Sequence, residues 1–98
     1  MAVEAKVRFF GPVRSIVGKK EQRVSLDDRA TMRDVLRELG LSNGPKFQRY
    51  IVIEGATLNP ALLVSINGRS LDDIQNLDIQ LPTDTTIDIM LATPIAGG

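Results

Sequence analysis

The chain of 98 residues contains no cysteine, no histidine and no tryptophan. Without cysteine it has no disulfide and no thiol nucleophile, and without both cysteine and histidine it lacks the usual ligands of zinc. Histidine is also the commonest general base. Carboxylates could still form an all-oxygen site for Mg²⁺ or Ca²⁺, but no stretch has the spaced acidic pattern of a calcium loop. We therefore expect no bound metal or cofactor and no catalysis by its own side chains.

Long apolar runs are also missing. No stretch approaches the roughly 18 apolar residues that a membrane helix needs, and the start, Met1-Ala2-Val3-Glu4, lacks the apolar region of a signal peptide. Hydrophobic residues make up 43% and charged residues 24%, which is ordinary for a globular domain. We expect one domain spanning residues 1–98, located in the cytoplasm, with no membrane partner.

Charge is balanced overall but not along the chain. The formal net charge is zero, yet residues 1–50 hold 11 Lys/Arg against 6 Asp/Glu, and residues 51–98 hold 1 against 6. Two interpretations stay open: the halves attract each other in the fold, or a surface of two signs orients a protein partner. Nucleic-acid binding is disfavoured, because the basic residues are interspersed with acidic ones and no basic tract carries interleaved aromatics.

Four stretches alternate between apolar and polar residues, which is the period of a strand with one buried face. In residues 3–10, Val7 and Phe9 face the core while Arg8 and Phe10 point outward. The other three stretches are residues 21–26, 62–67 and 86–91. Asn67-Gly68 is a preferred hairpin turn.

One stretch has helical periodicity. Thr31 opens it, Asp34 completes a capping box, and Met32, Val35, Leu36 and Leu39 share one face. We expect Gly40 to end this helix of about nine residues in the left-handed conformation.

The remaining segments are harder to interpret. Gly11-Pro12 breaks the first strand, residues 42–60 indicate a long loop with a possible short strand near Ile51-Val52-Ile53, and residues 71–77 suit a short 3₁₀ or α turn. The predicted class is α+β, with one main helix across a mixed sheet of about four to five strands. If the first and last strands are neighbours, the carboxyl end leaves the middle of the sheet.

That end is Thr93-Pro94-Ile95-Ala96-Gly97-Gly98, which we expect to be a flexible tail, residues 93–98. Its six residues reach about 20 Å when extended, at about 3.3 to 3.6 Å each. A frayed terminus without function is the alternative.

The chain resembles the β-grasp, ubiquitin-like sulfur carriers of the MoaD/ThiS family, in particular the branch of the molybdopterin synthase small subunit. The stretches that carry the resemblance are Lys6-Val7-Arg8-Phe9-Phe10-Gly11-Pro12-Val13-Arg14 with Val17-Gly18, residues 31–39, Leu63-Val64-Ser65-Ile66-Asn67-Gly68-Arg69, and Pro94-Ile95-Ala96-Gly97-Gly98. Two features depart from the family pattern. Pro82-Thr83-Asp84 replaces an Asp-Gly-Asp-type turn, and Leu91-Ala92-Thr93 stands where many members have aromatic and proline residues.

The resemblance implies that Gly98 carries the chemistry. A ubiquitin-activating-type enzyme would use ATP to adenylate its carboxyl group, and a sulfur donor would convert it to a thiocarboxylate. In the molybdopterin branch the tail, with Pro94, Ile95, Ala96 and Gly97, would enter a larger catalytic subunit of molybdopterin synthase. The chain would then be a carrier subunit and not an enzyme.

Docking needs a surface as well as a tail. Aromatic residues and arginines dominate interface energetics, so Phe10 and Arg14, which match the opening motif, are the predicted partner contacts. The alternatives are a satellite core contact for Phe10 and a solvated charge for Arg14. Arg69 is interpreted as a surface residue beside a turn.

Three other functions share these residues. One is sulfur delivery to thiamine, cysteine or tRNA thiolation. Another is a ubiquitin-like modifier whose Gly98 forms isopeptide bonds with lysines. The third is an interaction module with an inert tail.

Overall fold

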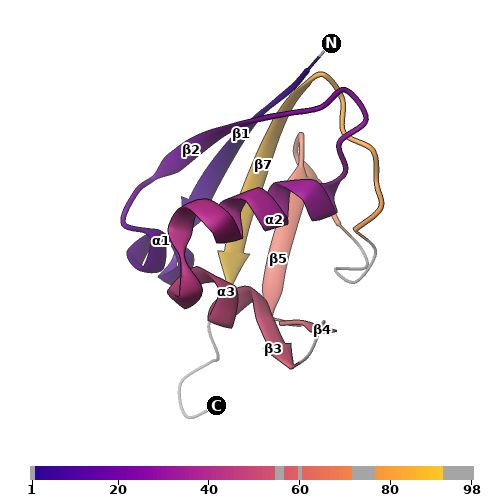
Figure 1. Ribbon diagram of the computed structural model, residues 1–98. Coiled ribbons are helices and arrows are strands. Elements are labelled where there is room, and N and C mark those ends of the chain that lie inside the picture. Colours follow the sequence, from indigo (N-terminus) through magenta and orange to yellow (C-terminus); the bar gives the residue numbers. More distant parts are fainter. Residues whose placement is uncertain (1, 55–56, 60, 72–76, 92–98) are drawn as a thin grey trace.

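The structure is a computed structural model that describes residues 2–54, 57–59, 61–71 and 77–91 (Figure 1). Its elements are β1 (Val3–Phe10), α1 (Pro12–Val17), β2 (Glu21–Leu26), α2 (Met32–Asn43), α3 (Pro45–Ile51), β3 (Val52–Glu54), β4 (Thr57–Leu58), β5 (Leu62–Ile66), β6 (Arg69–Ser70) and β7 (Asp84–Leu91). Among the described residues, no helix has the length and apolar character that crossing a membrane requires.

A five-stranded sheet has the order β2-β1-β7-β5-β6. β1 and β7 run parallel, whereas β1 with β2, β5 with β7, and β5 with β6 are antiparallel. The first and last strands are therefore neighbours, which is the condition under which the carboxyl end leaves the middle of the sheet, and β7 lies in its centre. A separate two-stranded sheet pairs β3 with β4.

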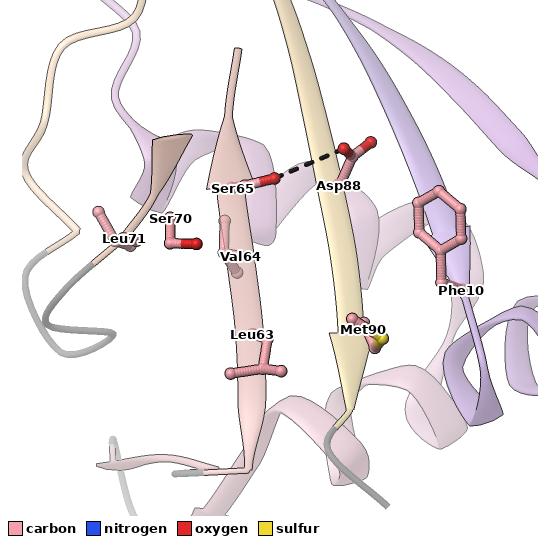
Figure 2. Close-up of a pocket in the computed structure, with 8 residues that line it drawn as sticks. All are labelled: Phe10, Leu63, Val64, Ser65, Ser70, Leu71, Asp88 and Met90. Carbon is pink, nitrogen blue, oxygen red and sulfur yellow. Dashed lines mark hydrogen bonds between the residues drawn. The ribbon is translucent and has the colours of Figure 1, made fainter. Parts of the chain in front are cut away.

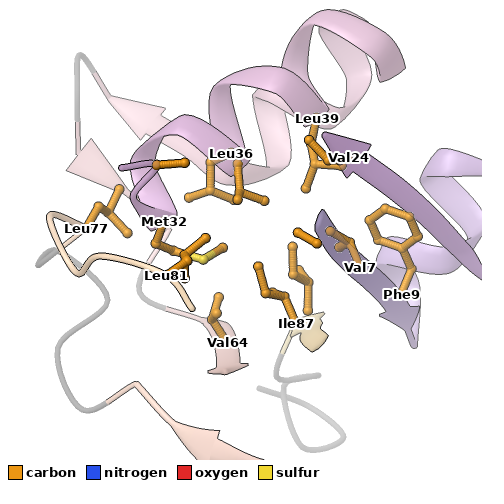
Figure 3. Close-up of a cluster of buried hydrophobic side chains, with 14 of the residues drawn as sticks. Val7, Phe9, Val24, Met32, Leu36, Leu39, Val64, Leu77, Leu81 and Ile87 are labelled. Carbon is orange, nitrogen blue, oxygen red and sulfur yellow. The ribbon is translucent and has the colours of Figure 1, made fainter. Parts of the chain in front are cut away.

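The core lies between this sheet and α2, which crosses one of its faces (Figures 1 and 3). The inward residues of β1 and the predicted apolar face of α2 are buried: Val3, Ala5, Val7 and Phe9 from the strand, and Met32, Val35, Leu36 and Leu39 from the helix. Ile87 and Ile89 of β7 are fully covered as well. α3 closes the same core, because Phe47 meets Phe9 edge to face with ring centroids 6.4 Å apart.

The start of α2 is confirmed and its end is not. Thr31 is extended, and its N–H donates to Asp34 Oδ2 at 2.9 Å, which completes the capping box. Gly40, expected to stop the helix, lies inside it; α2 continues to Asn43, and Gly44, with a φ of 84°, follows. Gly40 is buried, so its role concerns packing rather than termination.

The sequence patterns did not predict two short helices. Gly11-Pro12 ends β1 at Phe10 as expected, and Pro12 also begins α1. The expectation of a long loop over residues 42–60 is wrong at Pro45, because α3 starts there and runs to Ile51. Proline fits the first helical turn because the N–H that it lacks has no helical partner there. The possible short strand is confirmed as β3, one residue later than the apolar run.

The other turns agree with prediction where they are described. Asn67 and Gly68 both have positive φ values, 51° and 84°, as the expected hairpin turn between β5 and β6 requires. Most of the predicted short helical turn, residues 72–76, lies outside the described residues, as does the tail from residue 92 onward.

The charge asymmetry has a structural counterpart. Among the described residues, the basic first half is joined to the acidic second half by ion pairs of Arg8 with Asp88 and of Arg33 with Asp78, the latter at 3.2 Å. Attraction between the halves therefore operates within the fold.

Candidate functional site

The root of the carboxyl tail lies between two strands. In β7, Met90 is paired with Phe10 of β1 on one side and with Leu63 of β5 on the other. The last residue of β7, Leu91, is paired with Leu62. Gly98, predicted to carry the chemistry, lies outside the described residues, as do the predicted partner contacts Pro94, Ile95, Ala96 and Gly97. The last described residue, Leu91, therefore belongs to the central strand of the sheet and lies two residues before the predicted tail.

Beside this root lies a row of large apolar side chains on the sheet face opposite α2. Phe10, Met90 and Leu63 come from three adjacent strands and are 38%, 42% and 48% exposed. All three occupy outward positions of the strand alternation, whereas their chain neighbours Phe9, Ile89, Leu62 and Val64 are buried. We call Phe10, Met90 and Leu63 the apolar row. Exposed apolar side chains that cluster in this way indicate a contact surface.

A second row of outward residues lies next to the apolar row, two residues earlier in β1 and β7. Arg8 of β1 faces Asp88 of β7, and its Nε and Nη2 donate to Asp88 Oδ1 and Oδ2 at 2.5 and 2.9 Å. Ser65 of β5 is paired with Asp88, and its hydroxyl lies 3.5 Å from Oδ2 (Figure 2). We call Arg8, Asp88 and Ser65 the polar row.

Arg8 connects the two rows. Its guanidinium carbon is 5.8 Å from the centre of the Phe10 ring, within the range of a cation–π contact. The hydrogen bonds with Asp88 and then its charge raise the pKa of Arg8 above its ordinary value. The guanidinium is a cation at any physiological pH, and its two hydrogen bonds with Asp88 orient it.

A groove of about 370 Å³ extends along these rows. β5 and β7 form the floor of the groove, and Ser70 and Leu71 border it on the β6 side (Figure 2). The apolar row forms one end, and Ser65 and Asp88 form the other. Such a groove can receive apolar side chains of a protein partner at the end nearest the tail, with polar groups beside them.

Phe10 and Arg14 were the predicted partner contacts. Phe10 has the predicted outward orientation and lines the groove, rather than being a buried satellite of the core. Arg14 is exposed on α1, four residues further along the chain. Their contact with a partner stays a prediction. Arg69 is exposed in β6 beside the turn, in agreement with its interpretation as a surface residue.

Sequence reasoning missed Met90, Leu63 and the pairing of Arg8 with Asp88. Met90 and Leu63 are large apolar residues at outward positions of predicted strands, so a signal existed. Their assembly into one surface depends on pairings between β1, β7 and β5, which the sequence pattern did not specify. Among the described residues, no group of three or more potential ligand side chains is arranged to hold a metal ion.

A protein family and several known proteins are similar to this chain over most of its length. The family model described as ThiS family matches residues 7–98. Small archaeal modifier protein 3 of Haloferax volcanii is 31% identical over 96 residues, which are 98% of this chain and 100% of that protein. The chain belongs to the ThiS family.

Solved structures agree with this membership. Small archaeal modifier protein 1 from Methanosarcina acetivorans has a TM-score of 0.80 and 25% identity, over 100% of this chain and 99% of that one. A Pyrococcus furiosus chain assigned as molybdopterin converting factor, subunit 1, has a TM-score of 0.74 and 23% identity, over 93% of this chain and 99% of that one. The predicted β-grasp, ubiquitin-like fold is confirmed, and the family comprises small ubiquitin-like carriers and modifiers.

Proposed function

We propose that this ThiS-family chain is a sulfur carrier whose Gly98 carboxyl group is adenylated and then converted to a thiocarboxylate. One observation carries the proposal: the central strand β7, beside the exposed apolar row, ends at Leu91, three residues before the Pro-Ile-Ala-Gly-Gly sequence begins. A rigid sheet thus holds the root of the tail and presents a docking surface next to it.

The chemistry requires activation. An α-carboxyl group has a reference pKa of about 3.3 to 3.7, so at neutral pH it is an anion and a poor electrophile. A carboxylate oxygen of Gly98 attacks the α-phosphorus of ATP, and pyrophosphate leaves. A sulfur nucleophile at the oxidation level of sulfide then attacks the acyl carbon, and AMP leaves with the bond electrons. The product is a terminal thiocarboxylate.

The two glycines suit this reaction. Without a Cβ atom, Gly97 and Gly98 can pass through a narrow channel and leave the terminal carbonyl unhindered. The tail is long enough to enter an active site while the sheet stays outside, because six extended residues reach about 20 Å.

The partner that docks first is an ATP-dependent, ubiquitin-activating-type enzyme. The apolar row supplies the anchor, since a few well-packed side chains near the centre of an interface contribute most of its binding energy. Arg14, exposed on α1, is the second predicted contact with this enzyme.

The sulfur acceptor that we propose is the pterin precursor of molybdopterin, with the tail inserted into the large subunit of molybdopterin synthase. The opening motif, Lys6 to Arg14, and the Pro-x-Ala-Gly-Gly ending support this branch. So does the fold shared with the Pyrococcus furiosus chain assigned as a molybdopterin converting factor.

A second function has its own support. The relative that is 31% identical over nearly the whole chain is named a modifier protein, so Gly98 could instead form isopeptide bonds with lysines of other proteins. Both functions begin with the same adenylation and differ in the nucleophile that follows.

Intact-mass analysis tests the proposal. The chain is incubated with ATP, the purified activating enzyme and a sulfide source, and the expected result is the mass gain of one oxygen-to-sulfur exchange. Deletion of Gly98 should abolish the gain. An unchanged wild-type mass, with the enzyme shown to be active, would contradict the sulfur-carrier proposal.

Immunoblotting of cell lysate separates the two fates. Adducts of higher mass that disappear when Gly97 and Gly98 are deleted would establish the modifier. A single free band, together with the mass gain in vitro, supports the carrier.

A further inference from the structure

Asp88 and Arg8 differ in how many of their hydrogen-bonding groups have a partner within the polar row. Asp88 receives Arg8 Nε on one oxygen, and Arg8 Nη2 and the Ser65 hydroxyl on the other. A guanidinium has five N–H donors, and Asp88 uses two of those of Arg8. The Arg8 side chain is also the more exposed member of the pair, at 46% against 26% for Asp88. The outer surface of the pair therefore presents cationic donors rather than a neutral patch.

The polar row falls within any stable interface centred on the apolar row. Arg8 and Asp88 precede Phe10 and Met90 by two residues in their strands, so the rows are about 6.6 Å apart. A stable protein interface buries about 800 Å² on each side, which corresponds to a disc of about 16 Å radius. A partner seated on the apolar row thus removes water from the remaining donors of Arg8.

Such desolvation has a cost unless the partner replaces the lost hydrogen bonds. Donors of a charged group that are buried without an acceptor destabilise a complex, whereas a charge-assisted, two-pronged bond to a carboxylate stabilises it. The guanidinium is the more exposed member of the Arg8–Asp88 pair, and Glu21, paired with Arg8 across β1 and β2, already binds Lys6 at 3.2 Å. A partner carboxylate therefore fits this position better than another cation. Asp88 fixes the position of that group, which lowers the entropy lost on binding.

We propose that Arg8, positioned by Asp88, is a specificity-determining residue that binds a carboxylate on the activating enzyme, next to the enzyme's apolar contact with Phe10. The inference rests on the proposed function, since it identifies the chemistry of the partner at that same surface. A partner whose surface is apolar throughout is disfavoured, because it would leave the donors of Arg8 without acceptors.

The test uses the full-length chain as the titrated substrate in ATP–pyrophosphate exchange catalysed by the purified activating enzyme. Arg8→Met keeps most of the aliphatic stem but removes the donors, and it should raise the KM for the carrier about tenfold with little change in kcat. Arg8→Lys retains the charge but loses the planar set of N–H donors, and it should raise KM less than Arg8→Met does. The salt dependence of KM should weaken in Arg8→Met, because a contact between opposite charges has been lost.

A matched control lies on the other face of the sheet. Arg33 of α2 also forms an ion pair through Nε, with Asp78 at 3.2 Å, so Arg33→Met removes a similar surface pair away from the groove. It should leave KM unchanged. Thermal unfolding of both variants confirms that each is folded at the assay temperature.

Three outcomes are informative. A raised KM in Arg8→Met alone, with weaker salt dependence, supports the inference. A KM within about twofold of wild type, while Phe10→Ala still raises KM, overturns it and leaves the proposed function intact, because the ion pair is then only a surface pair of the kind that contributes little. Absence of exchange with the wild-type chain overturns the proposed function, and this inference with it.

Discussion

Phe10 and Met90 lie opposite each other across the parallel pair of β1 and β7, on the face of the sheet that is turned away from α2. Their backbones belong to the centre of the sheet, whereas their side chains are exposed to solvent. A change at either side chain should therefore affect partner binding far more than the stability of the fold.

The first prediction concerns Phe10. Phe10→Ala should raise the KM of the carrier in adenylation by about tenfold or more, because aromatic anchors at interfaces commonly contribute more than about 1 to 2 kcal/mol. Leu41→Ala is the matched control, since Leu41 is a large apolar residue that is 71% exposed on α2. ATP–pyrophosphate exchange kinetics measure the KM of both variants. Equal KM values for the two variants would show that the apolar row is not the docking surface.

The second prediction concerns the tail. Gly97→Val should abolish adenylation and leave the free energy of unfolding within about 0.5 kcal/mol of wild type, because it adds bulk to a predicted surface tail. Thr93→Val, at the start of the tail, adds no comparable bulk and should remain active. Urea unfolding and the exchange assay are the measurements. An active Gly97→Val chain would contradict the narrow-channel argument.

The third prediction is a pH dependence at the start of α2. The Thr31 N–H donates to the Asp34 carboxylate and, as the largest cause, lowers the pKa of Asp34; burial opposes this, while the Thr31 hydroxyl, Arg37 and Arg33 act in the same direction as the N–H. Because the folded pKa is below the unfolded one, near 3.9, the contribution to stability is complete above that value. This contribution of ionised Asp34 to stability is lost as the pH falls through the pKa of Asp34 in the folded state.

Asp34→Asn removes this titration while keeping an acceptor oxygen. The difference in unfolding free energy between wild type and Asp34→Asn should therefore shrink as the pH falls below about 4. Urea denaturation from neutral to acidic pH measures it. A difference that stays constant over this range would mean that the charge of Asp34 does not support the cap.

The fourth prediction concerns Gly40 and Gln48. Gln48 Nε2 donates to the Gly40 carbonyl at 3.1 Å, and a Cβ atom at Gly40 would lie 3.3 Å from Gln48 Cγ and Nε2. Alanine is about 1 kcal/mol better than glycine inside a helix. Gly40→Ala should gain less than this in the wild-type background, because Gln48 must move, and the full amount in a Gln48→Ala background.

A double-mutant cycle of unfolding free energies measures this coupling. If the gain from Gly40→Ala is the same in both backgrounds, the contact between α2 and α3 does not explain the glycine.

The contact between Gly40 and Gln48 shows why local sequence patterns did not predict the helix boundaries. A glycine after an apolar face is typical of a helix end, and a proline after a strand is typical of a break. Here Gly40 gives room to a side chain of α3, and Pro12 and Pro45 each begin a helix. These short helices have little periodicity of their own and depend on tertiary contacts, such as that between Phe47 and Phe9, which local patterns do not reveal.

The strands were easier to predict, because alternation follows directly from burial of one face. Val7, Phe9, Ile87 and Ile89 all face the core as their spacing indicated. The same alternation placed Phe10 outward. It did not bring Phe10 together with Met90 and Leu63, since cross-strand register is a property of the assembled sheet and not of any one strand.

The central position of β7 has a consequence for truncated chains. Without residues 84–91, the β1–β2 pair and the β5–β6 pair have no strand between them. A chain that stops before β7 therefore also lacks the apolar row, because Met90 is absent and Phe10 and Leu63 no longer share a neighbouring strand. A partner that binds this surface thereby distinguishes chains that contain the last strand from shorter ones.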